Sequence, residues 1–268
     1  MKIYRKYFLN VIRQGLSYRF NYFMRVVGSV VTLIVQYYIW KALLGNTSTP
    51  TSYGSIGFEQ MLTYIVISSI MRVFMRCNLI NSIDDKVRTG NIALDLIKPV
   101  NLKTLFFFDL LGETLFQMIF LLVPTMLIAI CFWNFSFPPI ERIAVFLVAL
   151  AGSFMLYFLI CYIIGILAFW FTQVWVLGRV LNDVVSFFSG ALIPLWFFPD
   201  NLRRISEILP FQHIYFSPIS IFTGTANGSD IMKILFMQWV WILIFYCIGK
   251  MIWNYAVQKI TIGNCETR

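Results

Sequence analysis

The residues best able to do acid–base chemistry lie close together between positions 200 and 213. His213 is the only histidine of the chain, and the carboxylates of Asp200 and Glu207 precede it. A histidine and a carboxylate at a membrane surface could act as base and acid in a transferase. However, His213 stands among aromatic residues and prolines, which favours a packed side chain. A membrane-embedded transferase is therefore the least favoured functional class.

Motifs for nucleotide, metal or thiol chemistry are absent from the sequence. No GxxxxGK[ST] string occurs, because Gly249 and Lys250 follow Phe245 and Tyr246 where a glycine would be needed. The five cysteines show no CxxC spacing: Cys77, Cys131, Cys161, Cys247 and Cys265. One histidine and scattered thiols do not form a metal site. We expect a chain that is not an enzyme and holds no metal or cofactor.

A second group of charged residues lies in a loop at about 81–103, and six of its residues are candidates for contact with a partner: Asp84, Asp85, Lys86, Arg88, Gly90 and Asp95. Ser82 is expected to cap a short helix with acidic residues in its first turn. Gly90 would end that helix, an apolar segment follows, and Pro99 ends the stretch. The pattern predicts a shaped docking surface; an ordinary ordered loop is the alternative.

The composition indicates that the solvent of this chain is lipid. Of its 268 residues, 59% are hydrophobic and only 12% are charged, about half the charged share of a soluble domain. The formal net charge is +9, and such an excess normally lies in cytoplasmic loops that face anionic headgroups. Because the basic residues flank apolar runs, nucleic acid is not an expected partner.

Six apolar runs are long enough to cross the bilayer as helices, at about 25–44, 59–80, 112–133, 143–170, 177–198 and 232–256. Residues 2–22 precede them with apolar and basic residues on opposite helix faces, which predicts an amphipathic interfacial helix. Basic residues crowd the N-terminal segment and the 81–103 loop, whereas the loop at 45–58 has none. This asymmetry predicts that both termini are cytoplasmic, although Arg203 and Arg204 fall on the outer side.

Charged residues near the spans fall into three pairs, each four residues apart: Arg72 with Arg76, Asp109 with Glu113, and Arg179 with Asp183. The first pair is expected to snorkel toward the inner surface. The second is expected at the inner interface, since the third span can begin near position 114. The third is expected to pair on one helix face. None resembles a proton relay at the membrane centre, as a secondary transporter would want.

The segment at about 190–222 breaks the helical pattern before the last span. Pro194 is expected to kink or end the fifth span. Asp200 or Asn201 would cap a second short helix, which Pro210 would stop. An apolar helix that breaks, turns and returns amphipathically predicts a re-entrant or interfacial hairpin, whose backbone must lie against protein or a watery cavity.

With these features the chain resembles the type-2 ABC export permeases, and the resemblance covers essentially its whole length. The run from Arg88 to Asn101, Arg-Thr-Gly-Asn-Ile-Ala-Leu-Asp-Leu-Ile-Lys-Pro-Val-Asn, looks like a signature of one permease branch. Gly190 to Leu195, Gly-Ala-Leu-Ile-Pro-Leu, is a shorter and weaker match.

This resemblance implies an all-α membrane protein with six transmembrane helices, an amphipathic N-terminal helix and a re-entrant helical hairpin before the last span. It also implies that residues from about Ile83 to Ile97 couple the permease to a cytosolic ATPase. Two permeases, identical or homologous, would pair with two ATPase subunits that bind ATP and magnesium. We expect an exporter of amphiphilic or hydrophobic substrates in a bacterial cytoplasmic membrane; a stand-alone secondary transporter or channel is the alternative.

Overall fold

The computed structural model describes residues 19–44, 49–51, 54–75, 78–97, 101–133 and 137–263. The amphipathic helix predicted at 2–22 lies almost wholly outside these ranges. Its last four residues, from Arg19 onward, form the start of the first described helix.

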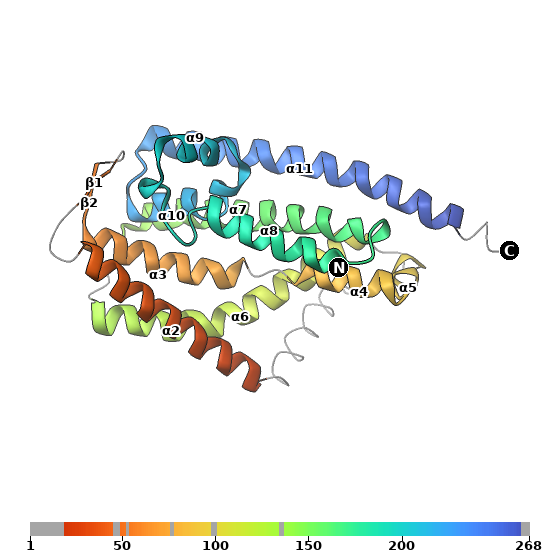
Figure 1. Cartoon of the computed structure of the whole chain (residues 1–268), viewed down its shortest axis with the longest axis horizontal. Coiled ribbons are helices and arrows are strands. Elements are labelled where there is room, and N and C mark those ends of the chain that lie inside the picture. Colours follow the sequence, from red (N-terminus) through yellow and green to blue (C-terminus); the bar gives the residue numbers. More distant parts are fainter. Residues whose placement is uncertain are drawn as a thin grey trace.

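Six helices run along the long axis of the molecule, and successive ones run in opposite directions (Figure 1). They are α2 (Arg19–Leu44), α3 (Phe58–Phe74), α6 (Leu102–Trp133), α7 (Ile140–Ile166), α8 (Val174–Phe188) and α11 (Gly228–Gly263). Because neighbours in the chain alternate in direction, every connection lies at one of two ends of the bundle.

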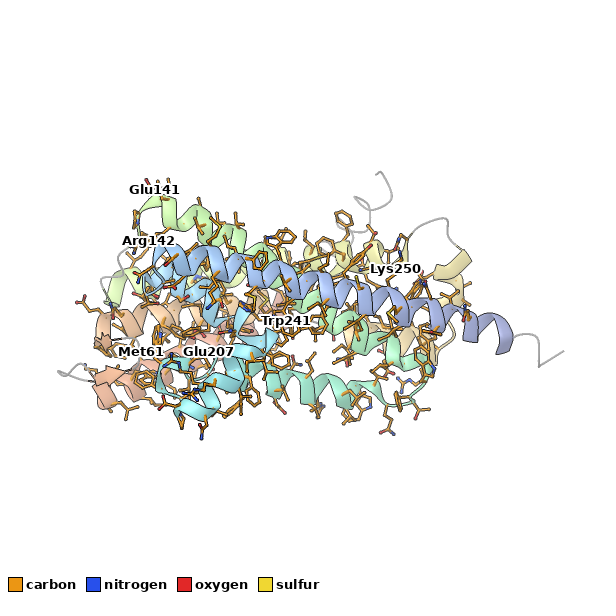
Figure 2. All side chains as sticks on the ribbon, turned by 90° about the horizontal axis from the view of Figure 1, so that it is seen from above. Met61, Glu141, Arg142, Glu207, Trp241 and Lys250 are labelled. Atoms are coloured by element: carbon orange, nitrogen blue, oxygen red, sulfur yellow. The ribbon has the colours of Figure 1, made fainter. Side chains whose placement is uncertain are left out.

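The short elements gather at these two ends. One end carries α4 (Leu79–Arg88), α5 (Ile92–Ile97) and the 3-10 turn η1 (Leu167–Phe169). The other carries β1 (Thr49–Thr51), β2 (Gly54–Ile56), η2 (Leu195–Phe197), α9 (Asp200–Ile208), η3 (Pro210–His213) and α10 (Phe216–Thr223). The two strands pair antiparallel; every other regular element described is a helix. In Figure 2, Glu207 and Arg142 mark the second end and Lys250 lies toward the first.

Helix α7 forms the centre of the bundle. It begins after Pro139, whose fixed φ is compatible with a helix start. The carboxylate of Glu141 in its first turn interacts favourably with the helix dipole. It packs against α11, α4, α10 and α8. Leu156, Leu159 and Cys161 are completely buried, so this helix supplies much of the apolar core that holds both ends together.

Five helical stretches of the described chain are long and apolar enough to cross a membrane: Val26–Leu44, Phe58–Arg88, Leu102–Ile130, Ile140–Phe169 and Gly228–Gln258. The predicted fifth span at 177–198 is the one that falls short. Its helix, α8, has 15 residues and is about 22 Å long, against about 30 Å of hydrocarbon.

The chain leaves α8 earlier than its sequence suggested. The helix ends at Phe188, ahead of Pro194, and Gly190 adopts a positive φ of 81°. A Cβ at position 190 would lie 2.9 Å from the Tyr64 hydroxyl. Glycine therefore permits both the turn and the close approach of α3, and the expectation that Pro194 breaks the helix was wrong in position.

Other predicted boundaries also move. Helix α3 ends at Phe74 instead of position 80, and α4 already begins at Leu79 with Asn78 as its N-cap residue. Ser82 is therefore not the cap; its backbone N–H donates to the Asn78 carbonyl at 3.0 Å. Helix α6 begins at Leu102, ten residues before the predicted third span, because the amphipathic turns that precede the apolar run continue the same helix.

Candidate functional site

Helix α4 is seated on the bundle by its apolar face. Leu79, Ile80 and Ile83 are at most 5% exposed, and α4 packs against α7 and α8. Two glycines make the close approach possible: a Cβ at Gly165 would lie 2.7 Å from Ile83 Cδ1, and one at Gly178 would lie 3.2 Å from Ile80 Cδ1. Helix α4 is thus fixed to two long helices at once.

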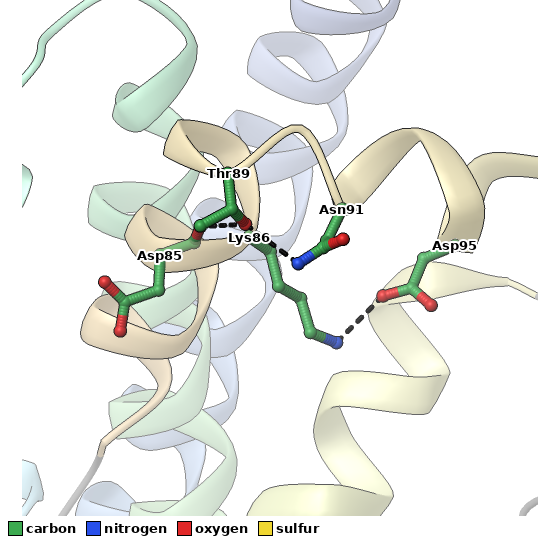
Figure 3. A network of polar contacts seen from close by, with 5 residues as sticks. All are labelled: Asp85, Lys86, Thr89, Asn91 and Asp95. Carbon is green, nitrogen blue, oxygen red and sulfur yellow. Dashed lines mark hydrogen bonds and ion pairs between the residues drawn. The ribbon is translucent and has the colours of Figure 1, made fainter.

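A tight turn and an ion pair join α4 to α5. Gly90 has a φ of 75°, so it ends α4 as predicted. Beyond this turn, Lys86 Nζ of α4 reaches Asp95 Oδ2 of α5 at 2.8 Å (Figure 3). The same ammonium lies 4.9 Å from the centroid of the Phe106 ring on α6, which ties the pair to a third helix. We call residues 79–97 the α4–α5 unit.

The opposite face of this unit is open. Arg88 and Asp85 form an ion pair at 2.9 Å, with side chains that are 68% and 64% exposed. Thr89 donates to the Asp85 carbonyl, and Asn91 donates to the Thr89 hydroxyl (Figure 3). Leu94 is 62% exposed. This face therefore presents exposed charges and an exposed leucine on an ordered turn, and arginine is one of the residue types enriched at protein interfaces.

The six residues selected from the sequence occupy this unit, but they divide into two sets. Asp85, Arg88 and Gly90 lie on its exposed face. Asp84 and Asp95 are only 5% and 7% exposed, and Lys86 is half-buried. The packing of Ile80 and Ile83 against the two glycines was not predicted, because nothing in the local sequence pattern links α4 to positions 165 and 178.

At the other end, residues 189–223 penetrate the bundle, and we call them the inserted segment. Ser153 Oγ and Gln238 Nε2 both donate to the His213 carbonyl, at 2.8 and 3.1 Å. Gln238 Nε2 also donates to the Ala149 carbonyl and the Ser153 hydroxyl, both at 3.0 Å. Ser153 lies thirteen residues into α7, about 20 Å from its start. The inserted segment therefore reaches about half-way along the bundle.

Helix α3 holds the same segment from the opposite side. Tyr64 donates its hydroxyl hydrogen to the Gly190 carbonyl at 2.7 Å, and Ser68 donates to the Ala191 carbonyl at 2.9 Å. Both hydrogen bonds are buried. Carbonyls that leave helical geometry thus find side-chain donors on neighbouring helices, as non-helical backbone at membrane depth requires.

The residues considered for acid–base chemistry do not meet as a group. His213 is 4% exposed, and its Nδ1 lies 3.1 Å from the Ser217 hydroxyl. His213 and Glu207 line one pocket of about 270 Å³, whereas Asp200 does not line it. The His213 carbonyl belongs to the hydrogen-bond network with Ser153. The Ser217 hydroxyl is within hydrogen-bond reach of the His213 ring, but among the described residues no carboxylate is bonded to that ring to orient it as a base, and the burial of His213 favours a packing role.

The charged pairs near the spans also behave differently from expectation. Arg72 does not reach the inner surface: its guanidinium donates to Gln36 Oε1 at 2.7 Å and to the Ser69 hydroxyl at 3.2 Å, between α2 and α3. Arg179 lies over the Trp175 ring, 4.8 Å from its centroid. Within the described chain no ion pair joins it to Asp183, which is exposed on the outer face of α8.

Glu113 lies inside α6 and accepts a hydrogen bond from Gln117 Nε2 at 2.8 Å. Glu113 and Asp109 therefore stand four residues apart on one continuous helix, and their expected position at the inner interface stays a prediction. Among the described residues, no group of three or more histidine, cysteine, aspartate or glutamate side chains could hold a metal ion.

Comparison with known families adds one finding. A family model described as ABC-2 family transporter protein matches residues 30–263, which include both ends of the bundle and all the long helices except the first eleven residues of α2. No curated protein sequence matches the chain.

Proposed function

The chain belongs to the ABC-2 transporter family, and from that membership we propose that it is the permease subunit of an ATP-driven exporter. Two such permeases, identical or homologous, would form the translocation path for an amphiphilic or hydrophobic substrate. Two cytosolic ATPase subunits would bind ATP and magnesium and drive the cycle. The proposed location is the cytoplasmic membrane of a bacterium, with both termini cytoplasmic.

The α4–α5 unit is the observation that carries this proposal. Its exposed face presents Asp85, Arg88 and Leu94 to a partner. Its buried face packs closely on α7 and α8, because Ile83 and Ile80 lie against glycines of these two helices. A force applied to the exposed face would therefore move two long helices together, since packed interiors transmit displacement instead of absorbing it. A coupling element needs this combination of open surface and tight seat.

We assign the fifth of the six proposed crossings, the one missing from the five long apolar helices, to α8 together with the inserted segment. Helix α8 alone covers about 22 Å. The residues that follow it stay inside the bundle, bonded to Tyr64 and Ser68 of α3. A chain that descends again through α9, η3 and α10 before α11 forms a re-entrant hairpin on the outer side, and its bonded carbonyls support that assignment.

The outward face of α8 is the part of the surface best suited to border the path. Asp183 is exposed nine residues into α8, about 14 Å from its first turn. A charge at such depth costs about 2.5–3.5 kcal/mol when it faces lipid. The preceding Asn182, by contrast, accepts a hydrogen bond from the buried Tyr157 hydroxyl of α7 at 2.7 Å. Water or a second permease is therefore the better neighbour for this face.

The first experiment is co-purification of the tagged permease from native membranes in mild detergent, followed by an ATPase assay. Replacement of Asp85 and Arg88 by alanine should weaken retention of the ATPase roughly ten-fold, as loss of a central interface contact does. The matched control removes the Arg203–Glu207 ion pair (2.8 Å) at the other end of the molecule, and it should retain the ATPase. If no ATPase accompanies the wild-type permease, the exporter proposal fails.

Asp183 also favours a second candidate, an ion-coupled transporter that works alone. An exposed carboxylate at mid-depth without an ion-pair partner in the described chain could carry a proton or a cation. Transport in proteoliposomes separates the two functions. A proton gradient that drives transport without ATPase, and a loss of that transport in Asp183→Asn, would support the second candidate.

A further inference from the structure

Arg72 of α3 places a permanent positive charge deep inside the bundle. It lies fourteen residues after Phe58, where α3 begins at the end of the molecule that carries the inserted segment, and is therefore about 21 Å from that end. Its partner Gln36 lies eight residues before the end of α2, about 12 Å from the same end. Because an arginine side chain stays charged in proteins, the charge lies within the roughly 30 Å of hydrocarbon that the long helices cross.

The guanidinium does not extend toward the far end of α3. It donates to the Ser69 hydroxyl, one turn back toward the inserted segment, at 3.2 Å, and to Gln36 Oε1 at 2.7 Å. Both acceptors are neutral. A glutamine in place of Arg72 would also join α2 to α3 by a hydrogen bond, without the cost of burying a charge. The contact between the two helices therefore does not account for an arginine at this position.

The described part of the chain supplies no counter-charge for this guanidinium. None of its ion pairs includes Arg72. The ionisable side chains that act on Arg72 electrostatically are two phenols, Tyr64 of α3 and Tyr215 of the inserted segment. Since buried charges in proteins are normally paired, an anion from outside the chain would complete this site.

Part of the guanidinium is also available to such an anion. Both hydrogen bonds start from the same nitrogen, Nη2, so the N–H groups on Nε and Nη1 have no partner among the described residues. Neither of these nitrogens is among the fully enclosed polar atoms without a partner, and Arg72 as a whole is only partly buried. A bound molecule can therefore reach them.

The surface beside this site is apolar. Val35 and Ile39 flank Gln36 on α2 and are 51% and 50% exposed. A small soluble anion would have to leave water to reach Arg72, whereas an anionic group on an apolar tail approaches within the bilayer. Charged side chains at such depth mark substrate pathways, and guanidinium groups form strong charge-assisted hydrogen bonds with carboxylate and phosphate oxygens.

We propose that Arg72 binds the oxyanion headgroup of an acidic amphiphile. The headgroup oxygens accept hydrogen bonds from Nε or Nη1, and the tail lies among the apolar side chains of α2. The amphiphile is either a single-chain molecule that the permease exports or an anionic phospholipid of the membrane. Its role as cargo rests on the proposed function, whereas its binding does not.

The test compares two radiolabelled probes with the same apolar tail, oleyl phosphate and oleyl alcohol. The full chain is placed in phosphatidylcholine nanodiscs, and binding is measured relative to empty nanodiscs. The wild-type chain should bind oleyl phosphate roughly ten-fold more tightly, since a hydrogen bond to a charged group contributes about that much. Arg72→Gln should abolish this difference, and Arg72→Lys, which keeps the charge, should retain part of it. Lys233→Gln removes an exposed charge near the start of α11 and should change nothing.

Two further measurements identify the source and the place of binding. Phosphatidylglycerol is added to the nanodiscs, with empty discs of the same composition as reference. Displacement of oleyl phosphate assigns the site to an anionic phospholipid, and persistence assigns it to the single-chain molecule. A photoreactive diazirine derivative of oleyl phosphate should cross-link to peptides of α2, α3 or the inserted segment.

Equal affinity for the two probes would overturn the proposal without any variant. An unchanged preference for oleyl phosphate in Arg72→Gln, or cross-links confined to other helices, would overturn it as well. If Arg72→Gln does not fold, the probe comparison and the cross-links on the wild-type chain decide. Co-purification of an ATPase is read separately, so this proposal and the proposed function can fail independently.

Discussion

The two ends of the bundle differ in where their polar groups lie: at one end they are exposed on the surface, and at the other they are buried among the long helices. At the α4–α5 end, charged side chains form ion pairs on an open surface, and apolar side chains fasten the unit to α7 and α8. At the other end, backbone carbonyls of the inserted segment lie in the interior of the bundle. They accept hydrogen bonds from side chains of the long helices: Tyr64, Ser68, Ser153 and Gln238. One end is therefore built for contact, whereas the stability of the other depends on buried hydrogen bonds.

The largest expected effect on stability lies in the interior network. Gln238→Leu removes the donor to the Ala149 carbonyl, the Ser153 hydroxyl and the His213 carbonyl. The free energy of unfolding in detergent should fall by about 2–3 kcal/mol, since each bond contributes about 1 kcal/mol or somewhat less. Thermal unfolding measures the loss. Gln173→Leu at an exposed position is the control, and equal unfolding temperatures for the two variants would contradict the distinction between the ends.

The next effect concerns the seat of α4. Gly165→Ala places a Cβ 2.7 Å from Ile83 Cδ1 and should cost about 1–2 kcal/mol through overpacking. Gly249→Ala on α11 is the matched control, because its Cβ would meet Ile163 at an ordinary 3.5 Å. The same thermal unfolding assay compares the two alanines. Equal unfolding temperatures for the two alanine variants would show that the Ile83 side chain, or the α4–α5 unit as a whole, can shift to make room for the added methyl group.

A smaller loss is expected when a single hydrogen bond to the inserted segment is removed. Tyr64→Phe deletes the bond to the Gly190 carbonyl and should lower stability by about 1 kcal/mol. Tyr38→Phe, at a side chain that is 63% exposed, should have no effect. Protease sensitivity of the inserted segment should rise in the first variant only. A rise in both would point to a general effect of the lost hydroxyl.

The smallest stability effect should accompany the replacement of both Asp85 and Arg88 by neutral amides or alanine. Their ion pair is more than 60% exposed on both sides, and such pairs contribute less than about 0.5–1 kcal/mol. The unfolding temperature should therefore stay close to that of the wild type even if the ATPase is lost. A large drop in unfolding temperature would show that the pair holds the α4–α5 unit together, which would make it a structural element instead of a contact surface.

The long helices with uninterrupted apolar sequence were the easiest features to predict. Helix α7 begins three residues before its predicted span and ends four residues short of its predicted end, and α11 extends four and seven residues beyond its predicted ends. Gly90 ends α4 as its residue type suggested. Helix α9 begins at Asp200 and stops before Pro210, close to the predicted bounds. In each case the signal is local: an apolar run, a glycine at a helix end, or a proline.

The errors arose where apolar sequence is buried by protein without being helical. Residues 189–198 are as apolar as a span, but Ser189, Ala191 and Trp196 are buried against neighbouring helices in an irregular path. Hydropathy does not distinguish an apolar segment that spans the membrane as a helix from one that is buried by protein in an irregular path. The packing of α4 was missed for a related reason: Gly165 and Gly178 matter only because Ile83 and Ile80, which lie 82 and 98 residues earlier in the chain, pack on them.

Helix α7 touches both ends at fixed angular positions. Ser153, bonded to the inserted segment, and Gly165, beneath α4, are twelve residues apart. At about 100° per residue, the two contacts point about 120° apart around the helix axis. Insertion of one residue between them would rotate one contact by about 100° relative to the other, so only one end could keep its partner. The phase of this single helix thus sets the rotational register in which the two ends of the molecule are assembled.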